Sequence, residues 1–168
     1  VRRRRWDSEL FSYGVTRIVY GFFKIVMLAY YVVNRKMDLW IEGINPTNLA
    51  LLQYADCWQY GMNLYFQFSG YCDIAIGVSA LLGFRINENF NYPFLSPNIS
   101  EFWRRWHMSL TGWSREYIYP TVAAASRSPY LAIFISMLFI GLWHEFSIKY
   151  FLWGLYHGLG IIAHRHYQ

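Results

Sequence analysis

The sequence predicts an all-α integral membrane protein: a polytopic helical bundle with an amphipathic interfacial helix and long helices that are strongly tilted or broken. Of its 168 residues, 55% are hydrophobic and 21% aromatic, but only 15% are charged, a balance that suits lipid better than water. The net charge of +5 comes mainly from clusters beside apolar segments. Such clusters are typical of membrane-orientation signals. Nucleic-acid binding is not expected, because no basic soluble domain accompanies the clusters.

We expect one membrane-embedded domain over residues 1–168, because no internal repeat or low-complexity tract divides the chain. The chain opens with a valine and four arginines, without an initiator methionine or a signal-peptide pattern. We therefore expect an internal segment of a longer protein. The arginine end is expected on the cytoplasmic side of the membrane.

Residues 11–33 form the first predicted membrane helix. These 23 residues are mostly apolar and are long enough to cross a hydrocarbon core of roughly 30 Å. Arg17 and Lys24 interrupt the stretch, so both side chains must face protein or water rather than lipid. A turn-rich connection at residues 43–48 follows.

Residues 49–84 form a second long apolar segment, in which Asp56 and Asp73 are the only formal charges. A helix of 36 residues would be about 54 Å long, so this segment must tilt, break or leave the bilayer. Gly61, Gly70 and Gly77 are candidate bends that would also allow close helix packing. We expect Asp73 to orient a histidine or to cap a broken helix.

Residues 98–113, NISEFWRRWHMSLTGW, predict an amphipathic helix. Asn98 and Glu101 have the spacing of an N-terminal capping signature. Three tryptophans on one face with arginines on the other suit a helix that lies in the membrane interface or against the bundle. The apolar positions at helical spacing are Ile99, Phe102, Trp103, Trp106, Leu110 and Trp113.

Residues 130–163 form a third apolar segment, again too long for one straight membrane span. Ser128 and Pro129 predict an N-cap and a first-turn proline. The segment is either two helices that meet near residues 144–149 or one long tilted helix.

His144 is the strongest candidate for chemistry, because it ends a run of 14 nearly uninterrupted apolar residues. Burial keeps an imidazole neutral, which is the form that a general base needs. The alternative is a neutral histidine that is hydrogen-bonded to another helix. Glu145 and Lys149 are spaced i, i+4 and are expected to pair, which leaves His144 without a charged partner.

His107 is a second candidate, at the border of the amphipathic helix beside Arg104. A guanidinium nearby would favour a neutral imidazole, although a border histidine is often merely solvated. Asn89 and Asn91 either bind a polar substrate or shape turns, and His157 fits a packed, hydrogen-bonded helix residue. No nucleotide-binding glycine loop, nucleophile elbow or cysteine metal-ligand spacing is present, so we expect no bound metal.

Five linked motifs lie between residues 68 and 158. They are FSGYCDIAIG (68–77) with LGF (82–84), ENFN (88–91) with Pro93, EFWRRWHMSL (101–110), GLWH (141–144) and WGLYHG (153–158). In order and spacing they resemble the membrane-bound O-acyltransferase family, and within it the bacterial branch that contains alginate O-acetylases and the D-alanyl transferases of teichoic acid. The opening of the chain as far as Val33 also resembles this branch.

The resemblance implies a multi-pass protein of the bacterial inner (cytoplasmic) membrane that passes an acyl group from a cytoplasmic thioester to a hydroxyl on the outer side. The implied donor is acetyl-CoA or an acyl carrier protein, used as a co-substrate, with no bound cofactor. The implied partners are membrane lipid, the acyl donor, and either a polysaccharide acceptor or a periplasmic or extracellular acyl-relay protein.

By motif, His144 matches the catalytic histidine of the family and His107 matches its second histidine. His144 would act as general base, or would form an acyl-histidine, while His107, Arg104 and Arg105 would hold or polarise the donor. The other residues expected to bind substrate are Asn89, Asn91, Asp73, Trp106 and Trp143.

The motif at residues 69–77, with its aspartate, favours acetyl transfer to a polysaccharide over D-alanyl transfer to teichoic acid from a carrier-protein thioester. A transporter or a scaffold is the non-enzymatic alternative. Two positions depart from the family pattern. Glu145 follows His144 where the family usually has glycine, and residues 120–126 replace a proline-glycine-asparagine type of loop.

Overall fold

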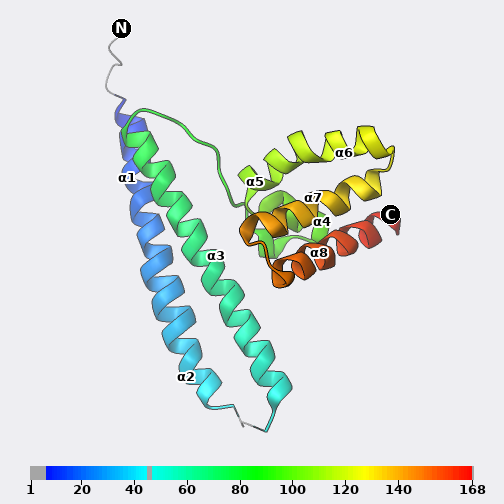
Figure 1. The fold of residues 1–168 in the computed structure, drawn as a ribbon. Coiled ribbons are helices and arrows are strands. Elements are labelled where there is room, and N and C mark those ends of the chain that lie inside the picture. Colours follow the sequence, from blue (N-terminus) through cyan, green and yellow to red (C-terminus); the bar gives the residue numbers. More distant parts are fainter. Residues whose placement is uncertain (1–6, 45–46, 168) are drawn as a thin grey trace. The chain divides into compact units, whose positions relative to one another are not determined.

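The computed structural model describes residues 7–44 and 47–167, and in these ranges it is helical without a strand, which confirms the all-α prediction (Figure 1). The chain divides into two compact units, residues 1–87 and residues 88–168, and each is described by itself. The prediction of a single domain stays a prediction. The arginine cluster at residues 2–5 and part of the connection at 43–48 lie outside the described residues.

The first unit begins with a continuous helical segment, made of α1 (Ser8–Phe23), a π-helical stretch (Lys24–Lys36) and α2 (Met37–Glu42). Asp7 caps it, since its Oδ1 accepts a hydrogen bond of 3.0 Å from the backbone N of Leu10. Among the described helices, Ser8–Glu42 is the one long and apolar enough to cross a membrane. It contains the predicted helix at residues 11–33 and extends beyond it at both ends.

The second helix of this unit, α3 (Leu49–Leu81), returns antiparallel to the first as one unbroken helix (Figure 1). Of the three expectations for this segment, a break is therefore excluded. Its glycines serve packing instead: a Cβ on Gly77 would lie 2.5 Å from the carbonyl oxygen of Gly14, and a Cβ on Gly70 would lie 2.8 Å from that of Gly21. Glycine at both positions lets the two backbones touch.

A buried ion pair cluster joins the two helices. Asp73, with only 4% of its side chain exposed, pairs with Arg17 and with the Nζ of Lys24, which lies 2.6 Å from its Oδ2. This confirms that Arg17 and Lys24 face protein, and it accounts for the burial of Asp73 without a bound substrate. The attraction between opposite charges that are buried together offsets part of the free energy needed to remove each charge from water.

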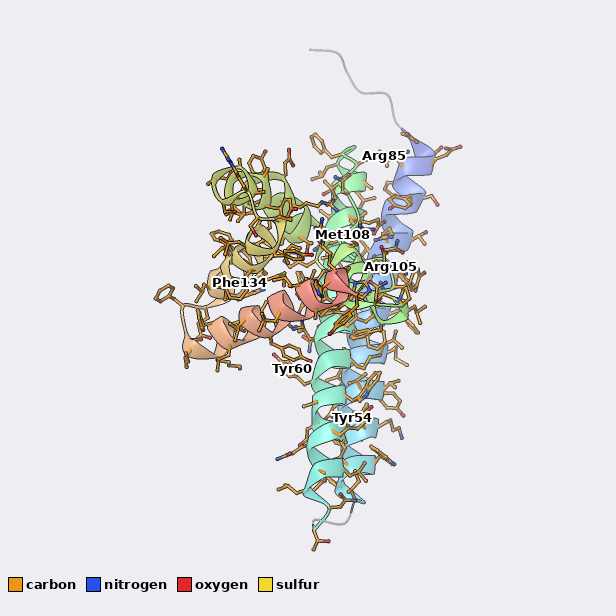
Figure 2. All side chains as sticks on the ribbon, turned by 90° about the vertical axis from the view of Figure 1, so that its right-hand side faces the viewer. Tyr54, Tyr60, Arg85, Arg105, Met108 and Phe134 are labelled. Carbon is orange, nitrogen blue, oxygen red and sulfur yellow. The ribbon has the colours of Figure 1, made fainter. Side chains whose placement is uncertain are left out.

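The outer surface of α3 carries large aromatic side chains. Tyr54 and Tyr60 are 63% and 68% exposed, and Figure 2 shows both projecting from the helix. Many other apolar side chains of the first unit are exposed in the same way. A surface of this kind is suited to contact with lipid or with further protein rather than with water.

The second unit starts with a loop and one 3₁₀ turn (Pro93–Leu95), and then consists of short helices followed by a hairpin of two longer ones. The helical segments are α4 (Ile99–Arg105), α5 (Met108–Trp113), a π-helical turn (Ser114–Ile118), α6 (Tyr119–Ser126), α7 (Pro129–His144) and α8 (Ile148–His166). Residues 120–126, which depart from the loop pattern expected for the family, thus lie in helix α6.

The prediction of one helix over residues 98–113 is wrong, because the backbone breaks at Trp106 and His107. His107 adopts a left-handed conformation with φ 46°. The preceding loop takes up the backbone groups at the break: Asn91 N donates to Arg105 O at 3.0 Å, and Met108 N donates to Asn89 O at 2.9 Å. The predicted start is confirmed, since Asn98 Oδ1 accepts from Glu101 N at 2.9 Å.

The helices α7 and α8 form an antiparallel hairpin that turns at residues 145–147, so the two-helix expectation is confirmed. Ser128 caps α7 by accepting a hydrogen bond of 3.2 Å from Leu131 N. The two helices touch through glycine: a Cβ on Gly141 would lie 2.4 Å from Tyr150 O, and a Cβ on Gly154 would lie 2.7 Å from Met137 O.

The apolar stripe of α4 packs onto this hairpin. The helix was predicted to lie in the membrane interface or against the bundle, and the contact with the bundle is the one observed. The core of the unit consists of Trp103, Met137 and Ile140. Trp103 meets the Trp153 ring of α8 edge to face, with 5.4 Å between ring centroids. Partly buried residues packed against this core are Ile99, Phe102, Trp106, Leu110, Trp153 and Ile161.

We predict that Asp73→Asn destabilises the protein by about 3 kcal/mol or more, because it leaves two cations in a buried place without their carboxylate. Asp56→Asn is the matched control, since Asp56 is exposed on the same helix. The free energy of unfolding of the detergent-solubilised full-length protein measures the effect. Equal stability of the two variants would show that the cluster does not hold the helices together.

We predict that Gly141→Ala destabilises the second unit by about 1–3 kcal/mol, because the new methyl group meets the backbone of α8, which cannot move aside as a flexible side chain does. Gly112→Ala is the control, since its Cβ would meet nothing within 4 Å. Thermal unfolding of both variants compares them. A Gly141 variant as stable as the Gly112 variant would contradict the close backbone contact.

Candidate active site

His144 is the last residue of α7, directly at the turn into α8. Glu145 ends the helix because its backbone is extended, with φ −163° and ψ 135°. The imidazole stacks on Tyr150, with 5.7 Å between centroids and 27° between planes, and it also contacts the rings of Trp143 and Trp153. Three aromatic rings thus define the orientation of the His144 side chain.

The side chain of His144 is exposed on the described part of the chain. The sequence suggested burial among apolar residues, but the apolar run ends at the end of the helix, where the chain turns. Within the second unit this imidazole is therefore exposed. Trp143, which was expected to bind substrate, lies beside it and is also exposed, at 57%.

The predicted ion pair of Glu145 with Lys149 is wrong. The i, i+4 spacing brings two side chains together on a continuous helix, and residues 145–147 are not helical. Over the described ranges of the chain no ion pair joins them, and the Lys149 ammonium lies over the Tyr150 ring at 5.8 Å. This contact places a cation on the ring that stacks on His144.

His107 is held at the break between α4 and α5 by a side chain of the preceding loop. Its Nδ1 lies 3.3 Å from Asn89 Oδ1, and the same oxygen accepts from the backbone N and from the Oγ of Ser109, at 3.0 and 2.9 Å. Because this oxygen only accepts, its contact with the ring is a hydrogen bond in the tautomer that carries the proton on Nδ1, and the Ser109 Oγ also lies 3.3 Å from this nitrogen.

The structure brings the two candidate histidines, 37 positions apart in sequence, into electrostatic range. Burial lowers the pKa of His107 below its usual value of 6.5, and repulsion from His144 lowers it further, while a backbone hydrogen bond partly opposes both effects. His107 lies outside the long apolar helices. At neutral pH its imidazole is therefore the neutral form.

The structure gives other predicted site residues packing or positioning contacts. Asn89 holds His107, as described above. Asn91 donates its backbone N to Arg105 O, and its side chain is exposed. Trp106 stacks on Phe102 with 5.5 Å between centroids. Their proposed contacts with substrate stay predictions.

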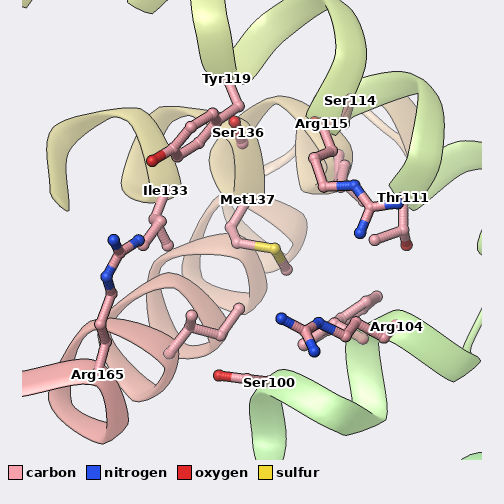
Figure 3. Close-up of a pocket in the computed structure, with 13 residues that line it drawn as sticks. Ser100, Arg104, Thr111, Ser114, Arg115, Tyr119, Ile133, Ser136, Met137 and Arg165 are labelled. Atoms are coloured by element: carbon pink, nitrogen blue, oxygen red, sulfur yellow. The ribbon is translucent and has the colours of Figure 1, made fainter. Parts of the chain in front are cut away.

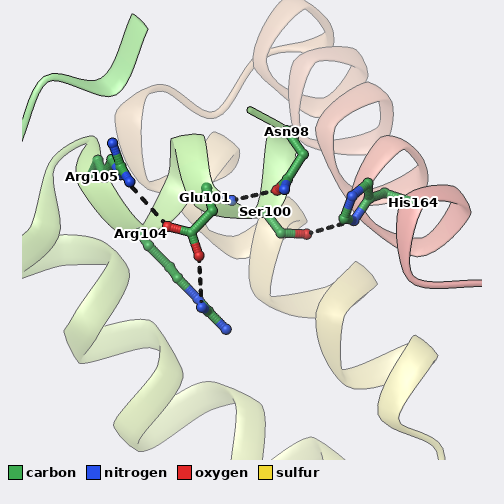
Figure 4. Close-up of polar contacts among 6 residues, drawn as sticks. All are labelled: Asn98, Ser100, Glu101, Arg104, Arg105 and His164. Atoms are coloured by element: carbon green, nitrogen blue, oxygen red, sulfur yellow. Dashed lines mark hydrogen bonds and ion pairs between the residues drawn. The ribbon is translucent and has the colours of Figure 1, made fainter. Parts of the chain in front are cut away.

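One carboxylate organises the two arginines of α4 (Figure 4). Glu101 lies 2.7 Å from Arg104 and 3.6 Å from Arg105, and Ser100 on the same helix contacts His164 of α8 at 3.3 Å. The Arg104 side chain is 65% exposed. Exposed ion pairs contribute little stability, so the ion pairs of Glu101 do not account for the presence of two arginines on α4.

His157 is packed as predicted, between Trp103 at 5.2 Å and Trp153 at 4.7 Å. The prediction of a hydrogen bond is not met at Nδ1, which is buried without a partner among the described residues. The described residues also contain no group of three or more metal-ligating side chains.

A cavity of about 450 Å³ lies within the second unit (Figure 3). Arg104, Arg115 and Arg165 line it, and of these only Arg104 was a candidate binding residue from the sequence. Neither His107 nor His144 lines it. Arg115 and Arg165 are isolated in sequence, so only the fold reveals that they converge.

Comparison with curated proteins finds the chain similar to bacterial acyltransferases. It is 40% identical to a probable alginate O-acetylase (AlgI) of Pseudomonas putida, over 96% of this chain and 33% of that protein. It is 32% identical to the teichoic acid D-alanyltransferase of Bacillus subtilis, over 99% of this chain and 45% of that protein. A peptidoglycan O-acetyltransferase of Helicobacter pylori is 36% identical, over 73% of this chain and 24% of that protein.

The chain thus spans about one third of the length of the alginate O-acetylases that it matches. The family model of the membrane-bound O-acyltransferases matches all of residues 1–168. This match, together with the relatives, confirms the resemblance found in the five motifs: the chain belongs to the membrane-bound O-acyltransferase family.

Proposed function

We propose that the protein containing this chain is a membrane-embedded O-acyltransferase that moves an acetyl group from a thioester donor to a hydroxyl of an exported or cell-surface polysaccharide. One observation carries the proposal. His107 and His144, the two histidines of the family motifs, lie near enough for the charge of one to affect the other. Two imidazoles in one place suit a proton transfer coupled to acyl transfer.

In this reaction His144 acts as the general base. The acceptor hydroxyl gives its proton to the imidazole while its oxygen bonds to the carbonyl carbon of the thioester. The carbon–sulfur bond then breaks, and the leaving thiolate takes the proton back from the imidazolium. Stacking on Tyr150 fixes the ring so that little orientation has to be gained in the transition state.

His107 is the second group of the site. Asn89 positions its ring at the break between α4 and α5. Arg104 and Arg105 carry positive charge on the same helix, and a phosphate-bearing donor such as acetyl-CoA, or the prosthetic arm of an acyl carrier protein, is an anion. We assign these three residues to the donor.

The proposed location is the bacterial inner membrane, with several spans in the full-length protein. Support comes from the family and from the many exposed apolar side chains. Acyl transfer across a membrane needs an acceptor on the outer side, so the proposed outer partner is a polysaccharide or an acyl-relay protein.

Two alternatives to acetyl transfer can be distinguished from it by measurement. D-alanyl transfer is the enzymatic one, and the higher identity to alginate O-acetylases, 40% against 32%, favours acetyl transfer. A transporter or scaffold would consume no thioester. Loss of label from acetyl-CoA in membranes that contain the full-length protein distinguishes both alternatives from the proposal.

We predict that His144→Ala lowers acetyl transfer by about 10²- to 10⁴-fold, the contribution of a well-placed general base. Transfer of labelled acetyl groups from acetyl-CoA to polysaccharide, in membranes with equal amounts of folded protein, measures the effect. His166→Ala is the control, since His166 is an exposed histidine at the end of α8, and we expect it to keep wild-type transfer. Retained transfer in the His144 variant would refute the assignment of the base.

We predict that acid destabilises the protein through His107. Its pKa is lowered in the folded state, so as pH falls below 6.5 the unfolded chain binds a proton first, and stability is lost until the lowered pKa is passed. His107→Asn should reduce this loss, because asparagine tolerates the left-handed backbone but does not titrate. Unfolding midpoints between pH 5 and pH 8 test this. An unchanged pH dependence in the variant would contradict it.

A further inference from the structure

The arginine-lined cavity of the second unit is a second site, separate from the histidines. Its apolar wall comes from α7 and α8, through Ile133, Met137, Ile140 and Ile161. Its arginines come from three segments: Figure 3 shows Arg104 of α4 and Arg115 of the π-helical turn on one side of the cavity, and Arg165 of α8 on the other. Three arginine side chains therefore surround a cavity that has one apolar wall.

The charges of these arginines are not balanced by the described part of the chain. No aspartate or glutamate lines the cavity, and Glu101 is shared between Arg104 and Arg105. Over the described residues, Arg115 and Arg165 have no ion pair. A concave site with several guanidinium groups and no carboxylate attracts an anion, for which the fork of arginine donors is well shaped.

Buried polar atoms in the cavity wall also lack partners. The Oγ atoms of Ser114 and Ser136 and the indole Nε1 of Trp103 have no hydrogen-bond partner among the described residues. These residues are 2%, 9% and 5% exposed, and all three line the cavity. Buried polar atoms without a partner are rare and costly, so three of them around one cavity indicate a polar ligand group.

We propose that this cavity binds an anionic phospholipid, with its phosphate among the arginines and an acyl chain along the apolar wall. Basic pockets between membrane helices are places where anionic head groups bind. The outer side chains of the same hairpin, such as Leu131 and Leu152, are exposed and suit a lipid environment. The reacting histidines do not line the cavity, and of its three arginines only Arg104 is also assigned to the acyl donor.

The test uses the full-length protein, purified in detergent and mixed with equal amounts of phosphatidylglycerol and phosphatidylcholine. Native mass spectrometry then reports which lipid stays bound. The wild type should retain phosphatidylglycerol in preference. Arg115→Gln and Arg165→Gln should each lower this retention about fivefold, the effect of one basic residue on an anionic lipid.

Two control variants guard against unfolding and against a general charge effect. Arg127→Gln removes an exposed arginine outside the cavity and should leave retention unchanged. Arg115→Lys combined with Arg165→Lys keeps the charge and should retain most of the binding. Neither Arg115 nor Arg165 is assigned to the donor, so acetyl transfer remains available as a measure of folding.

Three results would overturn the proposal. Equal retention of both lipids would mean that the cavity does not select an anion. Retention that is unaffected by the two glutamine variants would place the lipid elsewhere. Displacement of phosphatidylglycerol by an excess of coenzyme A would assign the cavity to the acyl donor.

Discussion

The close contact of α7 with α8 is the constraint on which the candidate active site depends. The carbonyl oxygens of Met137 and Tyr150 lie where the Cβ atoms of larger residues at Gly154 and Gly141 would have to be. At this separation Tyr150 and Trp153 of α8 reach the imidazole of His144 at the end of α7. A wider spacing of the two helices would separate these rings and leave His144 without a fixed orientation.

The same hairpin positions the second histidine. Trp153 presents an edge-to-face surface to Trp103, which is the buried centre of α4. With α4 packed there, the helix ends before Trp106 and the chain changes direction at His107. Asn89 stabilises the left-handed backbone of His107 through its contacts with His107 and Ser109. The packed rings and one asparagine thus hold His107 within electrostatic range of His144, and the arginine cavity forms within the same unit.

The parts of this structure that depend on local sequence could be predicted. Asn98 and Ser128 cap their helices as their spacing indicated, and the apolar stripe of residues 99–110 faces the core. Two local backbone features were not predictable. The left-handed His107 depends on hydrogen bonds that Asn89, 18 positions earlier, accepts from the residues around the break, and helical periodicity contains no sign of such a contact. The extended Glu145 depends on where α8 packs.

The site was predictable only as far as the motifs reach. His107 and His144 were proposed from the sequence, whereas the contact of Asn89 with His107 was not: Asn89 was expected to bind substrate or to shape a turn. Arg115 and Arg165 carried no pattern at all, since their meaning comes from the place where three helical segments meet. Charges and imidazoles that are distant in sequence become a site only through tertiary packing, which single-sequence patterns do not record.

The central claim is that His107 and His144 act together in one acyl-transfer site. A double-mutant cycle of His107→Asn, His144→Ala and both together, measured as acetyl transfer by the folded full-length protein, tests it most directly. Residues that act as a unit give strongly non-additive effects, so the double variant should lose little more activity than His144→Ala alone. If instead the two losses of activation free energy simply add, the histidines work independently, and the account of a shared site is wrong.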